Sequence, residues 1–507
     1  MIDLNTFSKE MMVKDIVDPK LITKHTILPL LRRGSRLFVA VSDPTNLPAL
    51  EEIRFNTGLN VETVIAEDDK LRRWIDQLES EQEGKAFDNL DDDLDNLETA
   101  SADADASGTE DAAAGSDDAP IVRFVNKLLL DAIKGGASDL HFEPYEKTYR
   151  VRFRQDGILE TVAKPPITTA SKLAARLKVM ARMDISERRV PQDGRIKLKI
   201  SKTRAIDFRV NTCPTLYGEK IVLRILDAES AKMGIDHLGY EEEQKKMYMD
   251  ALSKPQGMIL VTGPTGSGKT VSLYTGVNIL NTPERNISTA EDPVEINLEG
   301  VNQVNVNPKQ GMEFSTALRA FLRQDPDIIL VGEIRDLETA EIAVKATQTG
   351  HLVLSTLHTN SAPETLTRLR NMGVPSFNIA TSVILIIAQR LARRLCEHCK
   401  QPVDVPRQSL VEMGFTDEDI QSGFTVYGPS GKGCEKCKGG YKGRVGVYEV
   451  VRITDGIARI IMEEGNSIQI GDQCRKEGFN DLYRSGLIKV MHGVTSLEEV
   501  SRVTSGH

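Results

Sequence analysis

The feature that most constrains the fold of this sequence is an apolar run, residues 258–262, that leads directly into a glycine-rich segment, residues 263–270. The segment matches G-x-x-x-x-G-K-[ST], the Walker A pattern, at every fixed position: it reads Gly263, Pro264, Thr265, Gly266, Ser267, Gly268, Lys269, Thr270. The apolar run predicts a buried strand, and the residues after the loop fit a helix. A strand, loop and helix in this order predict an α/β domain with a nucleoside triphosphate site.

Each part of this loop has a predicted role in binding the nucleotide. The glycines let the backbone curve so that successive N–H groups point at phosphate oxygens, and the next helix presents its positive end to the same anion. Lys269 is predicted to reach the β- and γ-phosphates, and the Thr270 hydroxyl is predicted to ligate Mg²⁺. The pattern indicates the nucleotide but not what its hydrolysis drives.

A second strand candidate, residues 327–331, brings an acid to its carboxyl end. Open α/β sheets bind their ligands at this end of their strands. Gly332 stands where many P-loop enzymes carry Asp, so Glu333 is the acid left near Mg²⁺ or the attacking water.

A third segment, residues 287–295, brings Glu291, Asp292 and Glu295 together at a predicted turn. On its own this segment would be a solvated loop marked by Asp292 and Pro293. Beside a P-loop, one of its carboxylates could orient the attacking water. Glu291 and Glu333 are therefore both candidates for this role, and Glu333 is the favoured one.

Residues 350–360 hold two histidines in a strand-like run that ends in Ser, Thr, His and Asn. His358, at the end of this run, suits a sensor of the γ-phosphate. The alternative is a hydrogen-bonded strand end without a catalytic role.

Four cysteines form two C-x₂-C pairs that are separated by 34 residues: Cys396, Cys399, Cys434 and Cys437. Four thiolates satisfy a closed tetrahedral Zn²⁺ site, so the pairs predict structural zinc. The long separation predicts that the intervening segment is a loop or subdomain of its own. A redox role would need a separate explanation for each pair. The two other cysteines stand alone, a distribution typical of a reducing compartment.

The net charge of −10 is concentrated in residues 76–118, which carry sixteen acidic side chains and one basic one. This tract is rich in Asp, Ala, Ser and Gly and has too little apolar surface to fold, so it is predicted to be a flexible acidic linker. The rest of the chain is net positive and can meet anions such as phosphates. Because no apolar run approaches about 20 residues, the sequence predicts no transmembrane helix, and the expected location is cytoplasmic.

Ordered modules are predicted on both sides of this linker. Residues 1–75 read as a small α/β module, with a strand at 37–41. Residues 149–154 alternate aromatic or apolar residues with arginines, so they predict a half-buried strand with one cationic face. Beyond about residue 230, apolar strands alternate with helices, as in a parallel sheet covered on both faces.

Together these motifs resemble the secretion ATPase superfamily of type II secretion and type IV pilus systems. The resemblance covers nearly all of the chain after residue 120 and, less specifically, residues 1–75. Beyond the P-loop, the supporting blocks are 137–144 (ASDLHFEP), 190–195 (VPQDGR), 218–220 (GEK), 291–295 (EDPVE), 332–336 (GEIRD), the histidine segment and 388–391 (AQRL). A series of blocks in one order is far more specific than the P-loop alone.

The resemblance implies a multidomain α/β chain. Residues 1–75 would be an N-terminal α/β module, 76–118 the linker, and 119–230 a PAS-like α+β domain. Residues 231–507 would be a RecA-like ATPase domain with the tetracysteine zinc subdomain at 395–440. ATP, Mg²⁺ and Zn²⁺ are the implied cofactors, and a homohexamer is the implied assembly.

The resemblance also implies that arginines from outside the P-loop complete the site. Arg195 and Arg209 of the PAS-like domain would reach the γ-phosphate when the domains close, and Arg319 and Arg323 would act at the same interface. The physical reason agrees, because arginines neutralise developing phosphoryl charge and their delivery by another domain couples hydrolysis to motion.

The function implied is that of a motor ATPase driving type IV pilus assembly. It would act on an inner-membrane platform protein, with other cytoplasmic assembly proteins, from a peripheral position at the inner membrane. A type II secretion motor is the nearest alternative. A nucleic-acid translocase is not expected, because the chain shows no stripe of basic and aromatic residues for stacking bases. A nucleotide-gated scaffold is disfavoured by the full set of catalytic candidates, and a retraction motor by the tetracysteine and the N-terminal module.

Overall fold

The computed structural model describes residues 13, 16–17, 21–22, 25–75, 119–200, 205–226 and 234–504. The predicted acidic linker, residues 76–118, lies outside them. The fold is mixed α/β, as predicted. The chain divides into two compact units, residues 1–131 with 171–186 and 195–206, and residues 132–170 with 187–194 and 207–507. This division runs through the predicted domain 119–230, so its boundaries stay a prediction.

The N-terminal module is a three-stranded sheet in the order β1-β2-β3. Its elements are β1 (Ile27–Arg33), β2 (Arg36–Val41), α2 (Leu47–Thr57) and β3 (Asn60–Ile65). Strands β1 and β2 are antiparallel, whereas β2 and β3 are parallel and are joined through α2. The predicted strand at 37–41 is present as β2, and Leu37, Val39 and Val41 lie in the same core as Ile53 of α2.

The next segments form a second sheet, in which β6, β5, β4, β9 and β8 are neighbours in that order. The elements are α4 (Ala119–Lys134), β4 (Ala137–Pro144), β5 (Tyr149–Gln155), β6 (Ile158–Ala163), α5 (Ala170–Met180), β7 (Gln192–Lys199), β8 (Ala205–Thr215) and β9 (Gly218–Leu226).

The predicted cationic face of β5 is present. Tyr149, Val151 and Phe153 are buried, and the arginines between them are partly exposed. Arg152 donates two hydrogen bonds, of 2.8 and 2.7 Å, to the buried carboxylate of Glu143. Burial alone would raise the pKa of Glu143, but hydrogen bonds from Arg152 and from neighbouring cations lower it to about 2. Arg150 and Arg152 of this face therefore pair with an ionised carboxylate.

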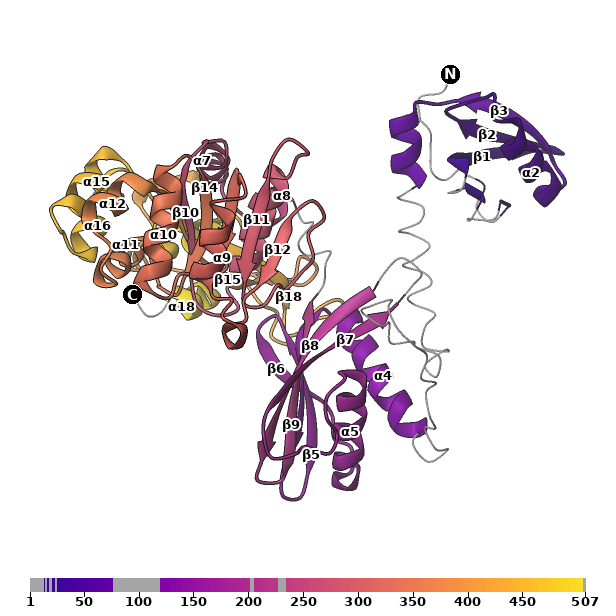
Figure 1. The fold of residues 1–507 in the computed structure, drawn as a ribbon, viewed down its shortest axis with the longest axis horizontal. Helices are drawn as coiled ribbons and strands as arrows, with labels where there is room; N and C mark the ends of the chain where they lie inside the picture. The colour runs from indigo at the N-terminus through magenta and orange to yellow at the C-terminus, as the bar shows by residue number, and fades with distance from the viewer. Residues whose placement is uncertain are drawn as a thin grey trace. The chain divides into compact units, whose positions relative to one another are not determined.

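The C-terminal domain is built on a seven-stranded sheet in the order β12-β11-β13-β14-β10-β15-β18 (Figure 1). The strands are β10 (Gly257–Thr262), β11 (Ile287–Glu291), β12 (Asn302–Asn305), β13 (Ile328–Val331), β14 (Leu352–Leu357), β15 (Val383–Leu395) and β18 (Tyr441–Arg452). Neighbouring strands are parallel except β15 and β18, which are antiparallel. The mostly parallel sheet agrees with the alternation of strands and helices in the sequence.

Helices cover both faces of this sheet, and the alternation of side chains along β10 shows it. Met258 and Leu260 pack in the core that contains α9, α10 and α11, whereas Ile259 and Val261 pack in the core that contains α7 and α8. Successive side chains of a strand point to opposite faces, so a strand buried on both faces is apolar throughout. Apart from two short helices between residues 400 and 430, the α-helices of the domain are α7 (Glu242–Leu252), α8 (Lys269–Leu280), α9 (Phe314–Phe321), α10 (Leu337–Gln348), α11 (Ala362–Asn371), α12 (Ser376–Ser382), α15 (Asp455–Met462), α16 (Ser467–Lys476), α17 (Leu482–Met491) and α18 (Leu497–Thr504).

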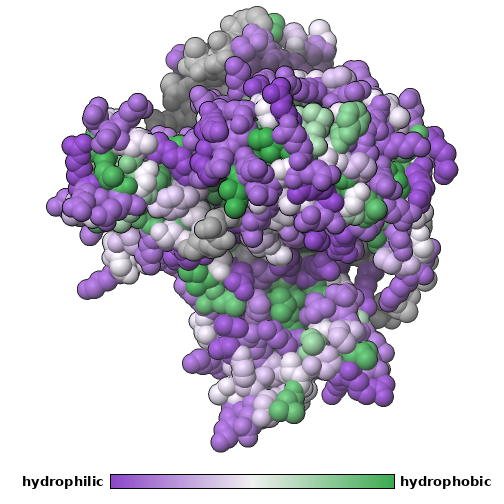
Figure 2. Space-filling model, turned by 90° about the vertical axis from the view of Figure 1, so that its left-hand side faces the viewer, coloured by the Kyte–Doolittle hydropathy of each residue, from purple (hydrophilic) through white to green (hydrophobic). Residues whose placement is uncertain are grey.

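The surface that carries α15 and α16 is mainly hydrophilic, and its hydrophobic residues lie in separate small groups (Figure 2). Ile468 of α16 and Met462 of α15 are exposed. In the described part of the chain, no helix combines the length and the apolar character needed to cross a bilayer.

Candidate functional site

The predicted phosphate-binding loop connects β10 to α8 at the carboxyl edge of the sheet. Its path depends on glycine at two positions. Gly263 and Gly268 have φ angles of 147° and 87°, in the region that favours glycine. A Cβ on Gly263 would also lie 2.6 Å from the carbonyl oxygen of Gln389. The loop therefore runs too close to β15 for a side chain at its first residue.

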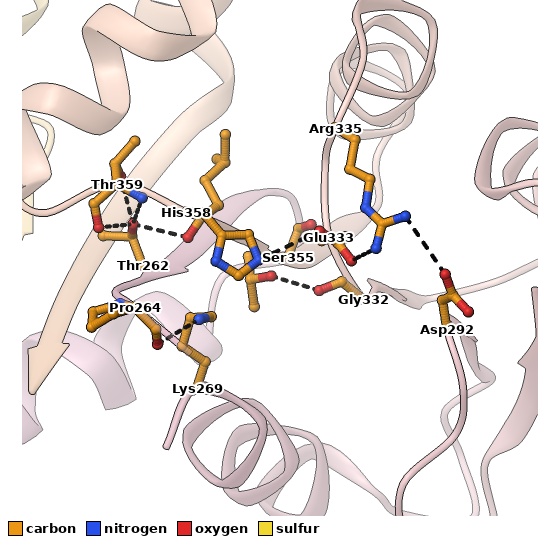
Figure 3. A network of polar contacts seen from close by, with 12 residues as sticks. Thr262, Pro264, Lys269, Asp292, Gly332, Glu333, Arg335, Ser355, His358 and Thr359 are labelled. Atoms are coloured by element: carbon orange, nitrogen blue, oxygen red, sulfur yellow. Dashed lines mark hydrogen bonds and ion pairs between the residues drawn. The ribbon is translucent and has the colours of Figure 1, made fainter. Parts of the chain in front are cut away.

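Lys269 begins α8 and reaches back over the loop. Its Nζ donates hydrogen bonds of 2.7 Å to the carbonyl of Gly263 and 3.0 Å to that of Pro264 (Figure 3). Burial lowers the pKa of Lys269, and the charge of Glu333 opposes this shift. The loop, the ammonium group and the N-terminus of α8 thus form one positively polarised anion site.

Glu333 and His358 follow two adjacent strands, β13 and β14, and face each other beside this site (Figure 3). His358 Nε2 lies 3.5 Å from a carboxylate oxygen of Glu333. Arg335 donates to the other carboxylate oxygen and also lies 3.6 Å from Asp292. The structure therefore places Lys269, Glu333 and His358 at one edge of the sheet, and their roles stay predictions.

Hydrogen bonds across the strand ends hold these residues in place. The Thr356 hydroxyl donates to the carbonyl of Gly332 at 2.6 Å, and the Thr262 hydroxyl donates to the carbonyl of Thr359 at 2.9 Å. A Cβ on Gly332 would lie 3.2 Å from the carbonyl oxygen of Ala290. A side chain at 332, such as the Asp of many P-loop enzymes, would therefore press on β11.

Glu291 lies in a different environment from the one predicted. Residues 287–291 form the buried strand β11 and not a turn, so Glu291 is the last residue of a strand and is 5% exposed. Its carboxylate accepts hydrogen bonds from the hydroxyls of Tyr274 and Thr289 and from the side-chain amide of Gln303. Burial raises the pKa of Glu291, and these donors oppose the shift. With three protein donors already bound, Glu291 is less suited than Glu333 to hold a water.

The predicted arginines lie in several places. Arg319 of α9 pairs with Glu338 at 2.5 Å, and Arg323 is exposed just after α9. Arg195 and Arg209 are exposed on β7 and β8. Their contact with a γ-phosphate stays a prediction of the family resemblance.

No role was predicted for two polar residues that border the site, Arg335 and Gln389. Gln389 is 1% exposed and contacts the phosphate-binding loop. The sequence does contain one sign that Gln389 is unusual. A Gln-Arg pair interrupts an otherwise apolar strand segment at residues 388–391.

The four predicted zinc ligands also come together. Their sulfurs lie within 4.8 Å of one another, and all four cysteines are free thiols. Three of the Sγ–Sγ distances are 3.8 Å for Cys396 and Cys434, 3.5 Å for Cys399 and Cys437, and 3.6 Å for Cys434 and Cys437. Tetrahedral zinc with bonds of about 2.3 Å needs sulfurs about 3.8 Å apart. The cluster therefore fits Zn²⁺.

The cysteine cluster joins two long strands at one end. Cys396 directly follows β15, and β18 begins shortly after Cys437. Between the pairs lie β16 (Gln401–Pro402), α13 (Arg407–Glu412), α14 (Asp417–Ser422) and β17 (Tyr427–Gly428). The intervening residues thus form a small subdomain, as their number predicted.

Zinc should be lost when one of these thiols is removed. We expect Cys437→Ser to lower the zinc content from about one ion per chain to less than about a tenth, because a closed structural site needs all four ligands. The melting temperature should fall as well. Metal analysis of the purified protein measures the first effect, with Cys213→Ser, an exposed cysteine outside the cluster, as the control. Equal zinc in both variants would contradict the assignment.

The chain is similar to known proteins over most of its length. The model of the type II/IV secretion system protein family matches residues 114–502, and that of the MshEN domain matches residues 1–85. The type IV pilus assembly ATPase PilB of Pseudomonas aeruginosa is 68% identical over 504 residues, which are 99% of this chain and 88% of that protein. The type II secretion system protein E of Dickeya dadantii is 46% identical over 84% of each chain.

A solved structure supports the fold of the site. The crystal structure of the pilus retraction motor PilT with bound ADP covers 74% of this chain and 95% of its own, with a TM-score of 0.52 and 26% sequence identity.

Proposed function

This chain belongs to the type II/IV secretion system protein family, and from that premise we propose that it is the motor ATPase of type IV pilus assembly. The observation that carries the proposal is 68% identity to a type IV pilus assembly ATPase over 99% of the chain. Hydrolysis of ATP is the shared activity of the family, and the loop with Lys269, Glu333 and His358 supplies the chemistry.

We assign each residue a role in that reaction from its place in the site. The backbone N–H groups of the loop, Lys269 and the N-terminus of α8 bind the phosphates. The Thr270 hydroxyl and the Glu333 carboxylate offer the oxygen ligands that Mg²⁺ prefers. A bound Mg²⁺ would supply neutralisation of charge on the phosphates. Glu333 orients the attacking water, and His358, on the next strand, senses the γ-phosphate.

The wider assembly rests on the family resemblance. Six copies form a ring in which Arg195, Arg209, Arg319 and Arg323 complete the site between domains. The ring works in the cytoplasm against an inner-membrane platform protein and other assembly proteins, and it does not act on nucleic acid. Closure and opening around ATP convert hydrolysis into the addition of pilin subunits.

Expression of this chain in place of the PilB protein of P. aeruginosa tests the proposal. In a P. aeruginosa strain without its own PilB, this chain should restore surface pili and twitching motility, because the two proteins share most of their sequence. The Lys269→Ala variant, expressed at the same level, should not.

The second candidate is a type II secretion motor, which 46% identity to protein E of D. dadantii supports. Restored protein secretion in a D. dadantii strain without that protein, together with no pili in the first strain, would favour this candidate and reverse our choice.

A further inference from the structure

Gln389 is a buried polar residue of β15 with no role in the chemistry described above. In the register of β15 and β10, Ala388 is paired with Thr262, the last residue of β10. Gln389 is therefore the next residue along, at the level where β10 becomes the phosphate-binding loop. Its side chain is 1% exposed.

Both polar atoms of the Gln389 side-chain amide form hydrogen bonds with residues in or next to the phosphate-binding loop. The side-chain Nε2 donates to the carbonyl of Ser267 at 2.6 Å, and Oε1 accepts from the hydroxyl of Ser272 in α8 at 2.7 Å. The Ser272 hydroxyl can donate to Oε1, and the Ser267 carbonyl only accepts, so the two partners fix the orientation of the amide. Gln389 thus bridges the loop and the first turn of α8.

The bond to Ser267 also fixes the direction of a backbone donor. The carbonyl of Ser267 and the N–H of Gly268 belong to one planar trans peptide group, so they point in opposite directions. When the carbonyl points to Gln389, the N–H of Gly268 points away from β15. This N–H is one of the donors that a P-loop offers to a phosphate.

We propose that Gln389 is a positioning residue that holds the phosphate-binding loop in the conformation that binds the β-phosphate. The inference deepens the proposed ATP hydrolysis at the same site. It acts through the peptide group of Ser267 and Gly268, and Gln389 itself does not touch the nucleotide. The β-phosphate is held alike in the ground state and the transition state. Loss of the hydrogen bond from Gln389 to Ser267 should therefore raise KM and leave kcat nearly unchanged.

Gln389→Met tests this, because Met has a similar length and no hydrogen-bonding amide. We expect ADP to bind roughly tenfold more weakly, the scale of one lost buried hydrogen bond. The KM for ATP should rise by a similar factor, with kcat within about twofold of the wild type. Binding of a fluorescent ADP analogue to the full chain measures the first effect without requiring turnover.

Thr495→Val is the matched control. The buried Thr495 hydroxyl donates at 2.8 Å to the carbonyl of Arg393, which also lies on β15 but away from the loop. This variant also loses a buried hydrogen bond to the same strand, and its ADP affinity should equal that of the wild type. If Gln389→Met binds ADP as tightly as Thr495→Val does, the inference is wrong.

A milder variant keeps the test decisive if Gln389→Met does not fold. Ser272→Ala removes only the bond that orients the Gln389 amide and leaves Gln389 in place. It should weaken ADP binding by a smaller factor than Gln389→Met, and unchanged affinity would overturn the inference. A wild type that binds ADP but hydrolyses no ATP would count against the proposed function alone.

Discussion

Replacing Glu333 with Gln is expected to lower the steady-state rate of ATP hydrolysis about a thousandfold, within the range that proton-transfer catalysis contributes. The carboxylate lies beside His358 and close to Lys269, and the proposed mechanism has it orient the attacking water. Gln keeps the size of the side chain but cannot accept a proton. ATP binding should persist, so the loss should appear in kcat.

Glu291→Gln is the control for this prediction, because it makes the same change on the neighbouring strand β11. Glu291 already accepts three hydrogen bonds from Tyr274, Thr289 and Gln303. Its replacement should lower the melting temperature, since the amide turns a donor toward at least one donor, and should reduce kcat by less than about tenfold. If Glu291→Gln abolishes turnover and Glu333→Gln does not, Glu291 and not Glu333 orients the attacking water.

Lys269→Ala should weaken nucleotide binding and lower the rate of turnover. The ammonium group is the one charge carried by the loop itself, and it lies against the carbonyls of Gly263 and Pro264. Without it, the phosphates keep only the backbone donors and the helix end, so we expect turnover at least about a hundredfold lower. Binding of the fluorescent ADP analogue should weaken in parallel.

Lys254→Ala is the matched control, because Lys254 is an exposed lysine that lies just before β10. It should bind ADP and hydrolyse ATP as the wild type does. If Lys269→Ala retains the ADP affinity of this control, the phosphates are held elsewhere and the site assignment fails.

The parts of the site that are local in sequence could be predicted from sequence alone. The loop, Lys269 and Thr270 follow β10 directly, and Glu333 and His358 each follow an apolar strand. Adjacent parallel strands bring such ends together, so the sheet edge itself could be anticipated. The four zinc ligands could be predicted in the same way, because the spacing within each C-x₂-C pair is typical of a zinc site.

What could not be predicted depends on contacts between distant residues. Tyr274, on α8, and Gln303, on β12, both bind Glu291, and the sequence gives no register that would place them there. The partner of Gln389 in the loop is 122 residues away. Without those contacts, residues 287–295 look like a turn, and Gln389 looks like an ordinary polar residue in a strand.

The length of β15 has a structural consequence. The strand carries Gln389 at the phosphate-binding loop and ends at Leu395, next to Cys396 of the cysteine cluster, and β18 is paired with it over this whole distance. At about 3.3 Å per residue, the two points are roughly 20 Å apart along the strand. A hydrogen-bonded ladder therefore joins the cysteine cluster to the end of β15 that contacts the phosphate-binding loop.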